Sequence, residues 1–364
     1  MLAILESNKI ERPELEALFT VYEETGMTCA MGLKPGLLKG DILLNLDTEE
    51  DDEIGIGCAG GVDITAKRTY KEEPVPENSV PYKIVVKGLK GGHSGMDIIK
   101  GLGNANKLMN RVLFGGFEKF GLRLSLINGG GLRNAIPRES EAVVTVDEIQ
   151  KKDFLDETGK LIQEIQQEYK SLEPKLNIEI SETHLPKKVM EVGVQELLVK
   201  ALYAAHNGVY RMSPEIEGLV ETSNNVARVE VENGEIEILC LTRSSVESSK
   251  NDLANSIRSG FEMAGFEVEL SGAYPGWAPN KDSAILKVLD SLYQKMNGQK
   301  AEVAACHAGL ECGILGHEYP EMDMISFGPT IRGAHSPDER ASISSAQKYW
   351  DFVLEVLKNI PEKE

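Results

Sequence analysis

Two neighbouring carboxylates, Glu23 and Glu24, end an apolar run and are followed by a Thr-Gly pair. A second apolar run, over residues 42–46, also ends at a carboxylate, Asp47. Carboxylates that share a poorly hydrated cleft repel one another, and a bound cation is the usual remedy. Adjacent side chains at a strand end point in different directions, so one can ligate a metal while its neighbour exchanges protons with a substrate. The pattern predicts the metal site of a hydrolase.

Three histidines stand in loops from which an imidazole could join such a site. His335 lies in Gly-Ala-His-Ser-Pro-Asp-Glu, between an expected strand and an expected helix, where a metal ligand would meet the edge of a sheet. His93 lies between glycines, which let the backbone approach a ligand closely. His307, also with glycine nearby, is the third candidate. The other histidines have no such setting: His184, His206 and His317.

An open sheet is needed to position these residues. Apolar runs predict strands over 15–22, 42–46 and 324–327, and amphipathic patterns predict helices near 282–296 and 344–359. In open α/β sheets the strand C-termini meet helix N-termini and loops at one edge, where ligands bind. We therefore expect an α/β domain with an open, mostly parallel sheet.

Between these elements, a proline-rich linker at residues 74–81 begins a segment with a different order of predicted strands and helices. This segment extends to about residue 272. The pattern there is strand, helix, two strands, helix and strand, followed by much the same again. Predicted strands lie at 82–88, 121–128, 139–147, 175–181, 225–231, 235–243 and 266–271; predicted helices lie at 98–113, 151–169, 193–206 and 248–264. This duplicated split βαβ pattern indicates an α+β insert. Asn233-Gly234 predicts a two-residue hairpin turn within it.

The composition of the chain disfavours some classes of binding partner. A chain of 364 residues is long enough for two domains. Its net charge of -19 disfavours nucleic acid and anionic membrane surfaces, which carry the same sign, and leaves small-molecule chemistry as the better hypothesis. No apolar run approaches the roughly 18 residues of a membrane span, and we expect a cytoplasmic protein. The five cysteines form no Cys-x-x-Cys pair, and the acidic run from Glu49 to Glu53 is interpreted as a solvated loop.

At these residues the chain resembles the co-catalytic zinc metallopeptidases, the family that includes carboxypeptidase G, aminoacylases and succinyl-diaminopimelate desuccinylase. The shared motifs lie at residues 23–27, 45–47, 57–61, 90–95, 132–137, 273–277, 307–313 and 335–339. The resemblance implies hydrolysis of dipeptides, of the Xaa-His type, by metal-activated water. Hydrolysis of N-acylated amino acids or other small amides is the alternative within the family.

The resemblance also implies a role for each site residue. The general base falls on Glu23, and the metal ligands fall on Glu24, Asp47 and His335, in a site that holds two Zn²⁺ ions when complete, with Mn²⁺ or Co²⁺ as alternatives. His93 corresponds to a lid-domain histidine that reaches into the partner subunit's site and stabilises the tetrahedral oxyanion.

Three further residues correspond to substrate-binding positions: His307, Asn134 and Arg332. The implied domains are a discontinuous catalytic domain, residues 1–61 and 274–364, and a lid and dimerisation domain, residues 62–273, through which a homodimer forms.

One feature of the family is not found. Its members carry a His-x-Asp motif and a bridging Asp upstream of the Glu-Glu pair, whereas only 22 residues precede Glu23 here and no histidine has Asp two positions later. The expectation from this difference is that an N-terminal segment is missing and that this polypeptide binds zinc weakly. A catalytically inactive product that retains the dimerisation domain is therefore a third hypothesis.

Overall fold

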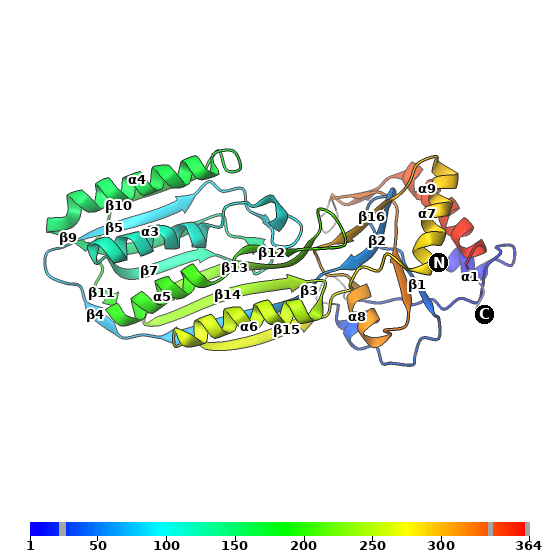
Figure 1. Ribbon diagram of the computed structural model, residues 1–364, viewed down its shortest axis with the longest axis horizontal. Coiled ribbons are helices and arrows are strands. Elements are labelled where there is room, and N and C mark those ends of the chain that lie inside the picture. Colours follow the sequence, from blue (N-terminus) through cyan, green and yellow to red (C-terminus); the bar gives the residue numbers. More distant parts are fainter. Residues whose placement is uncertain (22–26, 334–337, 361–364) are drawn as a thin grey trace. The chain divides into compact units, whose positions relative to one another are not determined.

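The computed structural model describes residues 1–21, 27–333 and 338–360, and the chain divides into two compact units (Figure 1). Unit 1 comprises Met1–Gly60, Glu215–Leu219 and Tyr274–Glu364. Unit 2 comprises Gly61–Pro214 and Val220–Ala273. The short segment Glu215–Leu219, which the predicted boundaries gave to the insert, lies with unit 1, where Ile216 packs against the hydrophobic core.

Over the described residues, unit 1 contains a four-stranded sheet in the order β1-β17-β2-β16. The strands are β1 (Ile42–Asn45), β17 (Asp323–Ser326), β2 (Glu53–Cys58) and β16 (Glu302–Cys306). β1 runs parallel to β17, and β16 runs parallel to β2, whereas the one bridge between β17 and β2 is antiparallel. The sheet thus consists of two parallel pairs, and the predicted α/β class is confirmed.

Apolar side chains point to both faces of this sheet. In β17, Ile325 packs with residues of α7 (Ala284–Asn297) and α9 (Ile343–Lys358), whereas Met324 packs with Cys312 of α8 (Glu311–Glu318). Strands covered on both faces read as continuous apolar runs, which is why β1 and β17 could be predicted. The remaining short elements of unit 1 are α1 (Leu2–Glu6), α2 (Thr28–Met31), β18 (Ile331–Arg332) and β19 (Arg340–Ala341).

The strand predicted over residues 15–22 is wrong for its described part, because residues 15–21 form no regular element. An apolar run becomes a strand only where a neighbouring strand accepts its backbone hydrogen bonds, and in the described residues β1 pairs with β17 alone. Side chains hold this segment instead. Glu16 Oε2 accepts hydrogen bonds from the N–H groups of Lys39 (2.7 Å) and Gly40 (2.9 Å), while Phe19 is 64% exposed.

Unit 2 is built on a sheet that has nine strands within the described residues, in the order β10-β5-β9-β7-β13-β14-β3-β15, with β12 beside β13. The pairings from β10 to β14 are antiparallel. The strands are β3 (Gly60–Thr69), β5 (Ser79–Lys87), β7 (Arg123–Gly130), β9 (Ser140–Asp147), β10 (Asn177–Glu182), β12 (Gly208–Met212), β13 (Val220–Glu232), β14 (Glu235–Ser244) and β15 (Glu267–Tyr274).

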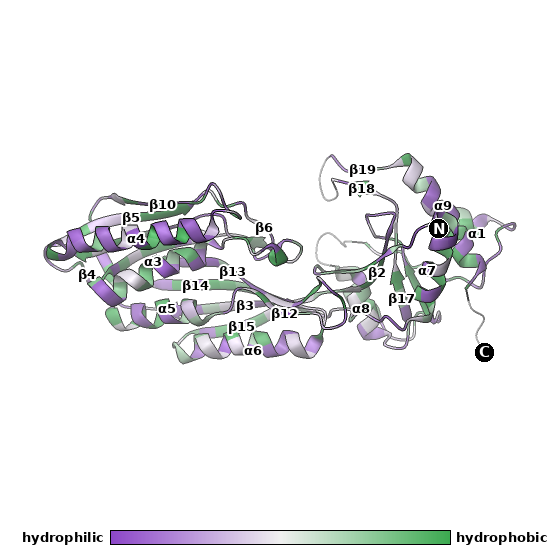
Figure 2. Ribbon diagram, turned by 45° about the horizontal axis from the view of Figure 1, so that its top comes forward, coloured by the Kyte–Doolittle hydropathy of each residue, from purple (hydrophilic) through white to green (hydrophobic). Residues whose placement is uncertain are grey.

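Amphipathic helices pack on the apolar face of this sheet (Figure 2). They are α3 (Ala105–Phe120), α4 (Lys151–Tyr169), α5 (Val192–Ala204) and α6 (Glu247–Met263). Along β5, Tyr82 and Ile84 are buried, whereas Lys83, between them, forms an ion pair with Glu141 of β9. The opposite face is therefore polar, as expected for an antiparallel sheet with one solvated side. Two further antiparallel sheets have two short strands each: β4 (Glu72–Pro74) with β11 (Lys188–Met190), and β6 (Gly92–His93) with β8 (Ala135–Ile136).

The predicted turn in unit 2 is confirmed, because Asn233 (φ 52°) and Gly234 (φ 82°) both have the positive φ of a type I′ hairpin. The helix predicted near 98–113 is displaced: only a 3₁₀ turn occupies Ile98–Lys100, and α3 begins at Ala105. Asn104 sets this start, since its side chain accepts hydrogen bonds from two N–H groups of the first helical turn. β2, β16 and α8 were not predicted. No described helix has the length and apolar character that crossing a bilayer requires.

Two glycines with positive φ give a matched test of this packing. At Gly130 (φ 74°) a Cβ would lie 1.8 Å from the carbonyl oxygen of Ala227, whereas at Gly121 (φ 58°) it would meet nothing within 4 Å. Gly121→Ala should cost about 1 to 2 kcal/mol for the left-handed backbone alone. Gly130→Ala should cost about 1 to 3 kcal/mol more, because the neighbouring backbone must move. Urea unfolding of both variants measures the difference, and equal losses would contradict the packing described.

Candidate active site

The ends of β1 and β17 are tied together by side chains. Asn45 and Ser326 are register partners in the two parallel strands, and Ser326 Oγ donates to Asn45 Oδ1 at 2.9 Å. Thr48 Oγ1 lies 2.8 Å from the same hydroxyl. The N–H of Asp47 donates to Asn45 Oδ1 at 3.0 Å, and the residue is exposed. The Asp47 carboxylate therefore stands at the C-terminal edge of a parallel strand pair, the place at which open sheets bind ligands.

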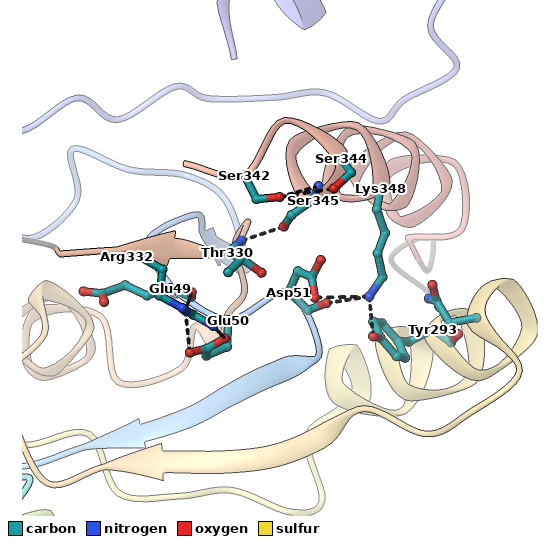
Figure 3. Close-up of polar contacts among 11 residues, drawn as sticks. Glu49, Glu50, Asp51, Tyr293, Thr330, Arg332, Ser342, Ser344, Ser345 and Lys348 are labelled. Carbon is teal, nitrogen blue, oxygen red and sulfur yellow. Dashed lines mark hydrogen bonds and ion pairs between the residues drawn. The ribbon is translucent and has the colours of Figure 1, made fainter. Parts of the chain in front are cut away.

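The loop that follows Asp47 is joined to the β18–β19 hairpin (Figure 3). The N–H of Ile331 donates to the carbonyl oxygen of Glu49 at 2.9 Å. Beside it, Arg332 makes a two-pronged ion pair with Glu50, with Nη1–Oε1 at 2.7 Å and Nη2–Oε2 at 2.9 Å. In the sequence, His335 lies between these two strands.

Three of the predicted catalytic and metal-binding residues lie outside the described residues: Glu23, Glu24 and His335. Their roles stay predictions. Within the described ranges, no group of three or more His, Cys, Asp or Glu side chains could hold a metal ion. The predicted donors, two carboxylates and an imidazole, are ligands that suit Zn²⁺, and the exposed carboxylate of Asp47 at a strand end fits such a set.

His307 and Arg332 have different surroundings. His307 follows β16 directly and is buried, and the loop around it is fixed by the N–H of Ala59, which donates to the carbonyl oxygens of Cys306 (3.1 Å) and Ala308 (2.9 Å). Arg332 is exposed, and its guanidinium is already bound by Glu50. Glu50 is thus a structural partner of Arg332, and the substrate-binding role of Arg332 stays a prediction.

The segment that leads towards Glu23 is attached near the same loop. Thr20 Oγ1 donates to Glu311 Oε2 at 2.8 Å, and Glu311 is the first residue of α8. This bond links the end of the described segment before the predicted acid pair to α8, the element that follows His307. The link is carried by side chains, which explains why strand patterns alone did not reveal it.

In unit 2, the ring of His93 is held in one orientation by the backbone. His93 Nδ1 accepts hydrogen bonds from the N–H groups of Gly95 (3.2 Å) and Met96 (3.1 Å). A nitrogen that accepts carries no proton, so the proton of the neutral ring is on Nε2. Burial lowers the pKa of His93, the positive charge of Arg243 lowers it further, and Asp97 opposes both. At neutral pH the ring is therefore neutral and presents Nε2–H as a donor.

Asn134 lies beside His93. Their segments form the β6–β8 pair, in which His93 faces Ala135, and the N–H of Ser94 donates to the carbonyl oxygen of Asn134 at 2.8 Å. The buried Asn225 fixes this arrangement, because its side-chain amide donates to the carbonyl oxygens of Arg133 and Ala135, the residues on either side of Asn134. Two predicted site residues are thus brought together in unit 2.

Arg243 was missed by the sequence analysis. It is buried in β14, close enough to lower the pKa of His93. The available signal was an arginine close after an apolar run, in Ile-Leu-Cys-Leu-Thr-Arg, since a buried arginine requires a partner of opposite charge or a polar ligand.

Comparison with known proteins identifies the family of this chain. The model of peptidase family M20/M25/M40 matches residues 1–359. The chain belongs to this family. The resemblance to metallopeptidases inferred from the motifs is therefore confirmed, and members of the M20/M25/M40 family are metal-dependent peptidases.

Within the M20/M25/M40 family, two relatives match the whole chain. The cytosol non-specific dipeptidase of Escherichia coli (strain K12) is 42% identical over 363 residues, which are 100% of this chain and 75% of that protein. The crystal structure of the aminoacylhistidine dipeptidase from Vibrio alginolyticus has a TM-score of 0.96 and 42% identity, covering 100% of this chain and 74% of that one. A succinyl-diaminopimelate desuccinylase from Sulfurovum sp. (strain NBC37-1) is 23% identical over 135 residues, 36% of each chain.

The protonation of His93 can be tested directly. We expect ¹⁵N NMR at pH 7 to show a neutral ring with its proton on Nε2. Asp97→Asn should lower the pKa of His93 further, because the variant removes the negative charge that raises it while keeping an acceptor for the N–H of His93. Asp252→Asn, at an exposed position on α6, is the matched control. A proton on Nδ1, or a pKa raised by Asp97→Asn, would contradict the geometry described.

Proposed function

We propose that this chain is a metal-dependent dipeptidase whose type substrate is a Xaa-His dipeptide. The observation that carries the proposal is the 42% identity to a dipeptidase along 100% of the chain. The shared fold, with a TM-score of 0.96 to an aminoacylhistidine dipeptidase, supports it. A fold alone would not, because one fold hosts many chemistries.

In this proposal Glu24, Asp47 and His335 hold metal, with Zn²⁺ as the ion that best suits carboxylate and imidazole ligands. Bound metal would polarise the peptide carbonyl and lower the pKa of the attacking water. Glu23 would act as a general base that accepts a proton from the attacking water and then as a general acid that gives the proton to the leaving amine.

His93 supplies the donor for the developing oxyanion. Its neutral ring carries Nε2–H because Nδ1 is occupied by two backbone N–H groups, and a preorganised donor stabilises the charge that appears on the carbonyl oxygen. Asn134, beside it, and Arg243, whose charge is near the ring, would bind the polar ends of the dipeptide. His307, a residue of unit 1, is a further proposed substrate-binding residue.

The proposed assembly is a homodimer formed through unit 2, in which His93 acts on the partner's active site. Two substrate classes compete within the family. Dipeptides are favoured by the relatives that match the whole chain, and N-acylated amino acids by the desuccinylase that matches 36% of it. Turnover of a Xaa-His dipeptide against the corresponding N-acyl amino acid decides between them.

Glu23→Gln should abolish dipeptide turnover and leave the metal content nearly unchanged, because the variant removes the proton carrier without removing a ligand. The expected loss is about 10²- to 10⁴-fold in rate. Glu24→Gln is the matched comparison at the next residue, and it should lower metal content and activity together. Metal analysis and kinetics on the same samples measure both. If Glu23→Gln loses its metal and Glu24→Gln keeps it, the two roles are exchanged.

A mixed dimer tests where His93 acts. One subunit carries His93→Ala and the other carries Glu23→Gln, and two different affinity tags isolate the mixed species. If His93 acts across the interface, one site keeps both groups and the mixed dimer should recover about half of the activity. If the ring acts within its own chain, both sites are defective and no activity should return.

A further inference from the structure

The loop over residues 47–52 carries five carboxylates in six positions: Asp47, Glu49, Glu50, Asp51 and Asp52. Like charges at this density repel one another and favour an open, solvated loop, which is the structure that the sequence predicts for residues 49–53. The structure instead holds the loop against two cations that lie almost 300 residues further along the chain, Arg332 and Lys348 (Figure 3).

The first cation binds on the hairpin side. Arg332 pairs with Glu50 through both guanidinium Nη groups, at 2.7 Å and 2.9 Å, and the adjacent Ile331 N–H donates to Glu49 at 2.9 Å. A single exposed ion pair contributes little. A two-pronged pair that is supported by a backbone hydrogen bond fixes the relative orientation of the two side chains as well as their separation. The reason is that the planar guanidinium matches the two oxygens of the carboxylate.

The second cation binds on the helix side. Lys348 Nζ, from α9, donates to the carbonyl oxygen and the Oδ1 atom of Asp51, both at 3.3 Å, and to the hydroxyl of Tyr293 at 2.7 Å. Tyr293 is 2% exposed and belongs to α7, and Lys348 Nζ lies 4.9 Å from the centre of its ring. The loop is thereby attached to a side chain of the hydrophobic core.

These two attachments are joined to each other. Thr330, just before β18, donates its N–H to Ser345 Oγ at 2.6 Å, and the N–H of Ser342 donates to the carbonyl oxygen of Thr330 at 3.0 Å. Ser342 is the N-cap of the helix that carries Lys348, and Ser345 lies in the first turn of that helix. Loop, hairpin and helix therefore form a closed ring of contacts, in which Glu50 and Asp51 are consecutive residues.

We propose that Arg332 and Lys348 are positioning residues, which hold the loop so that Asp47 presents its carboxylate to the metal. The inference rests on the proposed function, since it takes Asp47 as a metal ligand. In this role Arg332 acts through Glu50, to which its guanidinium is bound. Groups that orient ligands commonly change metal affinity by about 10- to 100-fold when they are removed.

The test compares four variants of the full chain. Arg332→Gln breaks the pair with Glu50. Its control is Arg340→Gln on the partner strand β19, where the exposed guanidinium of Arg340 donates to the carbonyl oxygen of Asp338. Lys348→Met breaks the contacts with Asp51, and Lys358→Met, on the same helix, removes an exposed pair with Glu11. Competition with a chromogenic chelator gives the Zn²⁺ affinity, and mass spectrometry gives hydrogen exchange in the peptides that contain Asp47 and Ile331.

Arg332→Gln and Lys348→Met should weaken Zn²⁺ binding by about 10- to 100-fold and accelerate exchange in both peptides, while the two controls should match the wild type. Glu50→Gln should reproduce Arg332→Gln, and the double variant should lose no more than either. Unchanged affinity and exchange in Arg332→Gln would overturn the inference, as would a higher KM for the dipeptide with kcat and metal affinity unchanged. If the wild type binds no Zn²⁺, the proposed metal site fails, and accelerated exchange in the metal-free variants still decides whether the ring holds the loop.

Discussion

The parallel pairing of β1 with β17 is the constraint on which the candidate site depends. It aligns Asn45 with Ser326, so that two chain segments 281 residues apart end at the same edge. From there one segment continues into Asp47 and the acidic loop, and the other continues into the β18–β19 hairpin. Parallel strands need a long crossover connection, and in this chain the connection contains the whole of unit 2.

The electrostatics of the two units differ in kind. In unit 1 the acidic loop concentrates negative charge, and two cationic side chains from the C-terminal part of the chain, Arg332 and Lys348, hold it in one conformation. In unit 2 the histidine is kept neutral by burial and by a nearby arginine, and its tautomer is fixed by backbone donors. In the proposed dipeptidase mechanism, the carboxylate of Asp47 would bind the metal cation, and the neutral ring of His93 would donate a hydrogen bond to the oxyanion.

Much of the fold could be predicted from the sequence because periodic elements carry local signals. The helix over 151–169 and the Asn233-Gly234 turn were predicted where the structure has them, and the α/β class followed from the apolar runs of β1 and β17. The strand over 15–22 failed because strand formation depends on a neighbour that a local pattern does not reveal. β2 begins within the acidic run, at Glu53, where charge concealed the strand. The ion pairs of the acidic loop join residues almost 300 positions apart, and no local pattern indicates such partners.

The central claim is that the edge formed by β1 and β17 is a metal site with Asp47 among its ligands. Anomalous diffraction at the zinc absorption edge, on crystals of the chain grown with Zn²⁺, tests this claim most directly. The account predicts an anomalous peak about 2.0 to 2.2 Å from a carboxylate oxygen of Asp47. Zinc bound only at other histidines or carboxylates, with no peak within coordination distance of Asp47, would contradict it.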